Sequence, residues 1–363
     1  MKRYGIITHY DVHNHGALLQ LTALIRILKQ KGIEAKALQF DKNYDFMGRE
    51  MKAKYDISTK SISIYLKYFR EKGLKCLKYN YSKHSTLNYY RKREALIGQY
   101  YTKSPQLDGV IIGSDEVFAL HTGPTPVFFG YCLPTEHVVS YAGSFGPTTI
   151  DDIERLHAST FVKSGIENMD AVTVRDSNSA DIIEVLTGSR PSIVVDPVIL
   201  YGFKEEIANL SKPTNDKYLL VYSYDNRMNE PEEVDVIWRY ARSKGLKIIS
   251  PGFFHKWCDK CIDVDPVNLL AWFRYAEEVI TDTFHGCVMA IITNVKFAVK
   301  TRENNHFKLS NLLNEYNLSE RIFTSWADIK GAMIPEINYG KVNVEIEKRR
   351  SESISHLLKM IGQ

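Results

Sequence analysis

The sequence has few cysteines and no apolar stretch long enough to span a bilayer. Five cysteines in 363 residues are too few for the disulfide framework of a secreted domain, so they favour a reducing cytoplasm. The N-terminus enters a strand-like segment from Tyr4 to Thr8 and lacks the apolar core of a signal peptide. We therefore expect a cytoplasmic globular protein, not a membrane-spanning or secreted one.

The net charge of +4 is unevenly distributed. Residues 52–103 contain thirteen Lys or Arg and three Asp or Glu, a local charge of +10, together with nine tyrosines. Basic residues mixed with amphipathic aromatics suit an anionic membrane surface or a lipid pyrophosphate. RNA, and helices that are simply solvated, are the alternatives. We expect a helical insertion with peripheral contact at the inner membrane face and no nucleic-acid partner.

The rest of the chain alternates strand-like and helix-like segments. Such alternation indicates mainly parallel sheets with helices on both faces, and the length favours two domains. The sequence therefore predicts an α/β protein of two Rossmann-like domains that face a cleft. We place the first domain at residues 1–205, with its insertion at 52–103, the second at 206–335, and a closing helix at 336–363.

The most informative segment is Thr281-Asp282-Thr283-Phe284-His285-Gly286. It follows the apolar pair Val279-Ile280 and precedes a helix-like run, which indicates a strand, a tight turn and a helix. A helix N-terminus favours a phosphate or carboxylate, and histidine can carry a proton at neutral pH. The segment points to chemistry on an acidic or phosphorylated small molecule. The alternative is a helix cap with a buried histidine.

Several separate segments together resemble the polysaccharide pyruvyl transferase family, over about Lys2 to Phe323. The motifs that carry the resemblance are Asn14-His15-Gly16-Ala17-Leu18-Leu19-Gln20, Gly113-Ser114-Asp115-Glu116-Val117-Phe118, Tyr141-Ala142-Gly143-Ser144-Phe145-Gly146, Val174-Arg175-Asp176-Ser177, Asp196-Pro197 and Thr281 to Gly286. The resemblance implies a GT-B-like fold and transfer of the enolpyruvyl group of phosphoenolpyruvate to sugar hydroxyls, giving a pyruvate ketal. It implies phosphoenolpyruvate as the donor substrate, no cofactor and no metal.

The resemblance also implies roles for the donor side of the cleft. His285 matches the family histidine and would be the general acid. Arg175 would grip the donor phosphate or carboxylate, unless it forms an ion pair with a neighbouring aspartate. Many family members carry an arginine where this chain has Thr283, so the second grip must come from other groups. The candidates are the helix N-terminus with Thr281, Thr283 and Gly286, or the later loop with Lys300, Arg302 and Asn305.

The acceptor side would lie in the first domain. Its predicted residues are Asn14, His15, Gly16, Ser114 and Asp115. Glycine at the start of a helix allows close backbone approach. Asp115 would orient or deprotonate the sugar hydroxyl, although an aspartate at such a position is often only a helix cap.

We therefore predict a pyruvyl transferase that acts on a precursor of a surface glycan such as capsule or exopolysaccharide, and the sequence leaves open whether the acceptor is polyprenyl-pyrophosphate-linked or soluble. A nucleotide-sugar glycosyltransferase of the same fold is one alternative, with a nucleoside diphosphate site in the second domain. A non-catalytic glycan-binding protein, suggested by Thr283, is another. The pair Cys258 and Cys261 lacks the four ligands of a structural zinc site.

Overall fold

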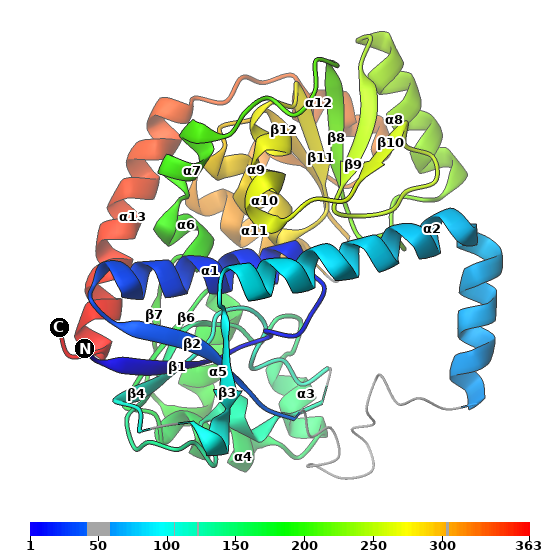
Figure 1. The fold of residues 1–363 in the computed structure, drawn as a ribbon. Helices are drawn as coiled ribbons and strands as arrows, with labels where there is room; N and C mark the ends of the chain where they lie inside the picture. The colour runs from blue at the N-terminus through cyan, green and yellow to red at the C-terminus, as the bar shows by residue number, and fades with distance from the viewer. Residues whose placement is uncertain (42–58, 105, 122, 303–304) are drawn as a thin grey trace.

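Two parallel β-sheets, each at the centre of one domain, form the framework of the molecule (Figure 1). The computed structural model describes residues 1–41, 59–104, 106–121, 123–302 and 305–363, with the backbone alone over 59–72. The first sheet has seven strands in the order β3-β2-β1-β4-β5-β6-β7. Their bounds are β1 Arg3–Ile7, β2 Glu34–Gln39, β3 Ile97–Tyr100, β4 Gly109–Ile112, β5 Val138–Gly143, β6 Ala171–Val174 and β7 Ser192–Ile193.

The second sheet has six strands in the order β10-β9-β8-β11-β12-β13. Its central strands β8 and β11 are buried at every residue, as expected for parallel strands covered by helices on both faces. The prediction of two Rossmann-like α/β domains is therefore confirmed. The strand bounds are β8 Tyr218–Tyr222, β9 Lys247–Pro251, β10 Lys260–Ile262, β11 Glu278–Thr281, β12 Phe297–Lys300 and β13 Ile322–Phe323.

Helices cover both sheets, and most of them follow a strand directly along the chain. In the first domain they are α1 His15–Gln30, α2 Thr59–Arg93, α3 Ile150–Arg155, α4 Ser159–Glu167, α5 Ser177–Thr187, α6 Pro197–Tyr201 and α7 Lys204–Asn209. Later helices are α8 Pro231–Ser243, α9 Pro266–Arg274, α10 Phe284–Ile292, α11 His306–Glu315, α12 Ile329–Met333 and α13 Tyr339–Met360. Short 3-10 turns occupy Tyr101–Lys103, Pro126–Phe129, Ser319–Arg321 and Trp326–Asp328.

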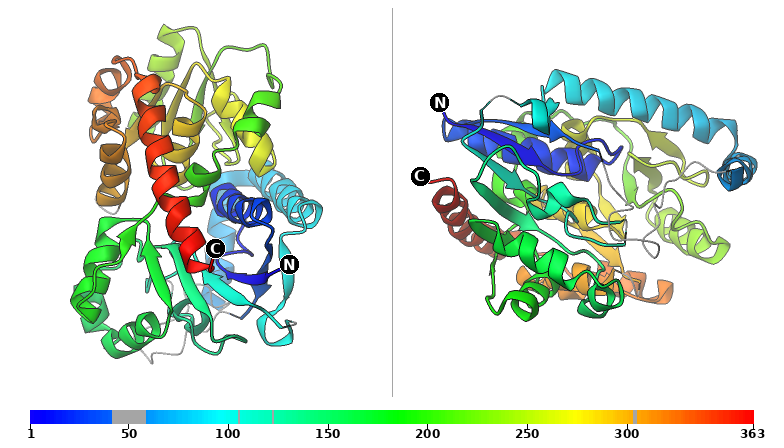
Figure 2. Two further views of the ribbon diagram at one scale, coloured as in Figure 1. Left: turned by 90° about the vertical axis from the view of Figure 1, so that its left-hand side faces the viewer. Right: turned by 90° about the horizontal axis from the view of Figure 1, so that it is seen from below.

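The closing helix α13 runs back from the second domain to the first, so the two chain ends lie close together (Figures 1 and 2). Its Ser353 hydroxyl accepts a hydrogen bond of 3.1 Å from the backbone N–H of Val195. After the helix ends, the carbonyl of Ile361 accepts one of 2.9 Å from Lys2 Nζ. The switch between the two sheets falls between β7 and β8, and the predicted boundary at residue 205 lies in that interval.

Helix α2 lies along both domains (Figure 1). On the first-domain side the Tyr90 hydroxyl is 2.9 Å from that of Thr22. On the second-domain side Ser82 and Thr86 donate hydrogen bonds of 2.6 and 2.7 Å to Asp263 Oδ2. The helix is kinked at Gly73, whose φ is 75°.

The predicted helical insertion at 52–103 is helical only in part. The structure places the helix at Thr59–Arg93, but Ile97–Tyr100 form strand β3, which pairs with β2. The prediction of helix was wrong there because the basic, tyrosine-rich composition hid a short edge strand that pairs on one side only. The first part of the predicted insertion, before residue 59, lies outside the described residues.

Candidate active site

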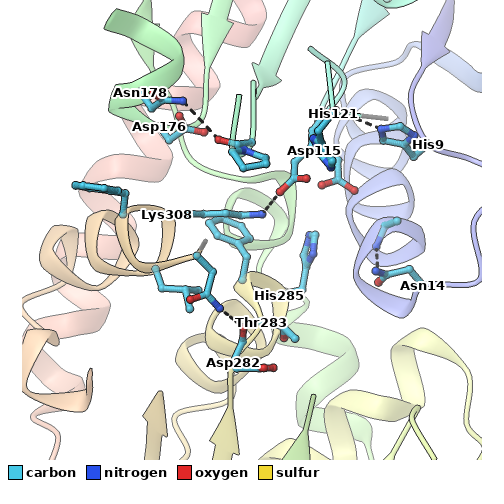
Figure 3. Close-up of a pocket in the computed structure, with 18 of the residues that line it drawn as sticks. His9, Asn14, Asp115, His121, Asp176, Asn178, Asp282, Thr283, His285 and Lys308 are labelled. Atoms are coloured by element: carbon cyan, nitrogen blue, oxygen red, sulfur yellow. Dashed lines mark hydrogen bonds and ion pairs between the residues drawn. The ribbon is translucent and has the colours of Figure 1, made fainter. Parts of the chain in front are cut away.

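A cleft of about 980 Å³ lies between the two domains. Its walls come from the loops that follow β1, β4, β5 and β6 in the first domain and β8, β9, β11 and β12 in the second. These loops meet because the carboxyl ends of parallel strands share one edge of a sheet, and the two such edges face each other. Figure 3 shows side chains from both domains pointing toward the centre of this cleft.

His285 lies in the first turn of α10 and lines the cleft. Thr283 caps this helix, since its hydroxyl accepts a hydrogen bond of 3.0 Å from the N–H of Gly286. The imidazole Nε2 is buried, makes no hydrogen bond within the described part of the chain, and lies 3.7 Å from Asp196 Oδ2. Burial lowers the pKa of His285, the carboxylates of Asp196 and Asp115 oppose this, and nearby cations add to it.

Gly16 in α1 packs directly against the His285 ring. A β-carbon at Gly16 would lie 2.3 Å from His285 Cγ, closer than any real side-chain contact allows. The glycine predicted for close backbone approach therefore approaches a side chain of the facing domain. Through this contact, the start of α1 fixes where the imidazole can lie.

Arg175 follows β6 and lies beneath the cleft, not on its surface. Its side chain is 2% exposed, and Nη1 donates a hydrogen bond of 3.1 Å to Asp196 Oδ2. Its Nη2 is 3.7 Å from Asp115 Oδ1, and the guanidinium lies 4.2 Å from the centre of the Phe284 ring. The ion pair that the sequence left open as an alternative is thus present. Nε and Nη2 have no hydrogen-bond partner among the described atoms.

Asp115 lines the cleft directly after β4. Burial raises the pKa of its carboxyl, but Arg175, His285 and other cations lower it by more, so it is held well below its usual range. A carboxylate with so low a pKa is a weak base at neutral pH. Orienting a bound hydroxyl therefore fits this group better than deprotonating one.

Two cations in the cleft were missed from the sequence. Lys308, on α11, makes an ion pair of 2.5 Å with Glu116 of the facing domain. Arg227, in the loop after β8, has Nη1 3.4 Å from Asp282 Oδ2 and lies 4.9 Å from the centre of the Tyr224 ring. Both line the cleft. The available signal was their place after a predicted strand, since Arg227 follows β8 and Lys308 follows β12.

Of the other predicted donor residues, Thr283 and Asn305 line the cleft. The Asn305 amide donates a hydrogen bond of 2.9 Å to the carbonyl of Asp282. Thr281 is buried beneath the turn, where its hydroxyl donates to the carbonyl of Tyr222 at 2.7 Å. Gly286 packs against Thr281, because a β-carbon there would lie 2.0 Å from the threonine Oγ1. Thr281 and Gly286 therefore shape the turn without lining the cleft.

Lys300 and Arg302 do not reach the cleft. Lys300 Nζ donates hydrogen bonds to the carbonyls of Thr301 and Thr324, at 3.0 and 2.8 Å. Arg302 Nη2 lies 3.2 Å from Glu233 Oε1, and its Nε lies 3.6 Å from Asp282 Oδ2. These partners hold both side chains behind the site, so their predicted place as a donor grip is corrected: the cleft cations are Arg227 and Lys308.

The predicted acceptor residues also separate into two groups. Asn14 lines the cleft, caps α1 through a hydrogen bond of 2.8 Å from the N–H of Gly16, and donates one of 3.3 Å to the Tyr224 hydroxyl. His15 is buried between the domains, with Nε2 2.8 Å from the carbonyl of Val264, and burial lowers its pKa to about 3. Ser114 is buried and donates to the side chain of Gln20. His15 and Ser114 therefore support the walls from behind.

The described residues include no group of three or more His, Cys, Asp or Glu side chains that could hold a metal ion. The cleft offers instead the imidazole of His285, the two cations Arg227 and Lys308 and helix N-termini, beside the carboxylates of Asp115, Glu116, Asp176, Asp181 and Asp282. Helices α5, α10 and α11 all have residues of their first turn in its lining. The second-domain side, with Arg227, Lys308 and the first turns of α10 and α11, suits a small anionic ligand.

A sequence model of the polysaccharide pyruvyl transferase family matches residues 14–304. The match spans most of the chain, so the chain belongs to this family, and the resemblance seen in its motifs is confirmed. A comparison with curated proteins gives no significant match.

Two solved structures share the fold with this chain. The co-structure of S. aureus MnaA with UDP is 14% identical, with a TM-score of 0.52 over 100% of this chain and 97% of that chain. A UDP-GlcNAc 2-epimerase of Methanocaldococcus jannaschii, in complex with UDP-GlcNAc and UDP, is 12% identical, with a TM-score of 0.50 over 99% of each chain. At this identity the likeness shows the GT-B-like fold alone.

Proposed function

We propose that the protein transfers the enolpyruvyl group of phosphoenolpyruvate to a sugar of a glycan precursor and closes a pyruvate ketal. The observation that carries the proposal is the meeting, in one cleft, of the His285 imidazole with the cations Arg227 and Lys308 of the same domain. Asn14 and Asp115 of the first domain line the same cleft (Figure 3). A proton donor beside a seat for anions is what this reaction needs. Phosphoenolpyruvate is the donor substrate, and the proposal invokes no cofactor.

The donor's phosphate and carboxylate would bind at the C-terminal domain. Arg227 and Lys308 supply positive charge, and the first turns of α10 and α11 supply backbone N–H groups. Lys308 is paired with Glu116 at 2.5 Å, and a multiply charged phosphate would compete with this single carboxylate. Arg175, from beneath the cleft floor, would act on the donor through Asp115 and Asp196.

His285 would donate its proton to the methylene carbon of the donor. Burial lowers its pKa in the free protein, while Asp196 and Asp115 act in the opposite direction. A bound phosphate and carboxylate would bring further negative charge beside the ring and favour the protonated form. The bound substrate would thus favour the protonated form of His285, which then donates its proton to that substrate.

The steps balance in atoms and charge. A sugar hydroxyl bonds to the central carbon, the methylene gains the His285 proton to become a methyl group, and the bond from carbon to the phosphate oxygen breaks. A second hydroxyl then closes the ketal. Of the two hydroxyl protons, one restores His285 and the other leaves with the phosphate. Asp115 and Asn14 would orient the attacking hydroxyls from the first domain.

An assay tests the proposal directly. The protein is incubated with phosphoenolpyruvate and with sugars that are soluble or polyprenyl-pyrophosphate-linked, and released phosphate is measured together with the acceptor's mass. The expected result is phosphate release that depends on acceptor and yields a pyruvylated product, lost in His285→Gln. Thermal unfolding with phosphoenolpyruvate or UDP-sugars is the companion measurement, because a specific ligand stabilises the folded state. Stabilisation by UDP-sugars alone, with no phosphate release, would contradict the proposal in favour of a glycosyltransferase.

A further inference from the structure

The outward face of α2 after its kink carries large apolar side chains in solvent. Leu74, Tyr81 and Tyr89 are 73%, 81% and 65% exposed, and Leu77 is 42% exposed. Leu74, Leu77 and Tyr81 follow one another at steps of three and four residues, so they lie on one stripe of the helix. The opposite stripe is buried against the protein and includes Cys76, Tyr79, Leu87 and Tyr90.

The same outward face is cationic. Lys75, Lys78 and Lys92 are exposed, and residues 73–93 contain no Asp or Glu. Two arginines near the end of the helix instead have partners within the protein. Arg91 donates hydrogen bonds to the carbonyls of Tyr10 and Val12, and Arg93 pairs with Asp265 at 3.2 Å.

We propose that this outward face of α2, made of Leu74, Lys75, Leu77, Lys78, Tyr81, Tyr89 and Lys92, docks on an anionic lipid bilayer. Lysines attract the negative surface, while tyrosine and leucine side chains enter the boundary between headgroups and acyl chains. The helix runs along the outer edge of the molecule (Figure 2, right), so a flat surface can reach it. In the part of the chain that the structure describes, no helix is long and apolar enough to cross a membrane, so the contact would be peripheral.

Two other occupants fit this face less well. A second copy of the chain packed face to face would bring like charges together, because the face is cationic throughout. A nucleic acid would use the lysines but would leave Leu74 and Leu77 in water, since sequence-independent binding rests on phosphate contacts. An anionic lipid surface satisfies both the charge and the apolar side chains.

Docking would also set the orientation of the cleft. Arg91 ties α2 to the loop between β1 and α1, which carries the cleft residues Val12 and Asn14. The acceptor side of the cleft would then lie near the bilayer, where a lipid-linked sugar is presented. This consequence rests on the proposed function, whereas the docking itself does not.

Vesicle binding tests the docking. The full chain is mixed with vesicles of phosphatidylglycerol and phosphatidylcholine, or of phosphatidylcholine alone, and the bound fraction is measured by flotation. The test variant is Lys75→Gln/Lys78→Gln/Lys92→Gln. Each lysine near an anionic surface strengthens binding about fivefold, so neutralising all three should weaken vesicle binding on the order of 100-fold. A second variant, Leu74→Ser/Tyr81→Ser, should weaken binding while keeping the charge.

The matched control is Lys330→Gln/Lys341→Gln/Lys348→Gln, which removes three exposed lysines from α12 and α13. It should bind anionic vesicles like the wild type, and thermal unfolding should show all variants folded. Equal vesicle binding by wild type and the α2 lysine variant would overturn the proposal. So would a wild-type dimer that the variant converts to monomer, or tighter binding of the wild type to polyuridylate than to anionic vesicles.

Discussion

Replacing Asp196 with asparagine tests how the cleft sets the protonation of His285. Asp196 Oδ2 lies 3.7 Å from His285 Nε2 and is buried, so its charge is little screened. Its Oδ1 caps α6 by accepting a hydrogen bond of 2.9 Å from Val198 N–H, and asparagine can keep that cap. The substitution therefore keeps the cap but removes the charge and, because an NH2 group replaces Oδ2, the hydrogen bond from Arg175.

The sign and size of the effect follow from this geometry. Without the carboxylate the imidazolium loses an attraction, so the pKa of His285 must fall. An opposite charge at this range changes a pKa by about 1–3. The alkaline limb of the kcat profile should therefore move to lower pH by the same amount. On the acid side of the limb, kcat should be retained. Removing one partner of a buried ion pair costs about 3–5 kcal/mol. Arg175 keeps Asp115 at 3.7 Å, so the loss of stability should be smaller.

The assay is kcat against pH at saturating phosphoenolpyruvate, run well below the melting temperature of the variant. Asp265→Asn is the matched control, because Asp265 also caps a helix, with a hydrogen bond of 2.9 Å from Asn268 N–H, and also pairs with an arginine, at 3.2 Å. It should lower stability without moving the alkaline limb. An alkaline limb that coincides with the wild type in a folded Asp196→Asn protein would refute the reasoning.

Three further predictions concern single side chains. His285→Ala should lower kcat by about 10²–10⁴-fold with the melting temperature little changed, and a kcat near the wild type would remove His285 from the mechanism. Gly16→Ala should lower kcat and should lower the free energy of unfolding by about 1–3 kcal/mol, because the new methyl group would lie 2.3 Å from His285 Cγ. Unchanged kinetics would mean that this contact relaxes freely. Arg227→Gln should raise the KM for phosphoenolpyruvate about 10–100-fold, because a hydrogen bond to a charged group contributes about 1.5–3 kcal/mol. Arg302→Gln, whose side chain lies behind the site, should leave the KM unchanged. An equal effect of both substitutions would point to a structural cause.

Strands at the centre of each sheet were predictable, whereas the edge strands β3 and β10 were not. The apolar runs of β1 and β11 signal burial on both faces, and the structure has these strands within a residue of the predicted positions. Strand β3 and the three-residue β10 lie at sheet edges and are only partly buried. Their sequences therefore contain few apolar residues in a strand-like pattern. Strand β10 lies in the segment of Cys258 and Cys261, whose most visible feature is the cysteine pair.

The candidate site could be predicted as far as it depends on the order of strands. Asn14, Asp115 and His285 each follow a strand, and parallel topology brings them to one cleft. Side-chain direction depended on partners distant in sequence. Glu233 draws Arg302 behind the site, and the helical position of Lys308 turns it toward Glu116. Arg302 and Lys308 both follow β12, and no local pattern shows which of the two side chains reaches the cleft.

The domain interface links the fold to the chemistry of the site. His285, the proposed acid, belongs to the second domain, while Asp196, Asp115 and Gly16, which contact it or influence its pKa, belong to the first. One continuous apolar core runs through this interface and contains residues of α1, α6, α9 and α10. Domains usually move relative to each other unless their interface is large and hydrophobic. A hydrophobic interface favours a fixed arrangement of the two domains, which would keep the imidazole beside its carboxylates, and in the proposed reaction the bound donor would then add its own negative charge.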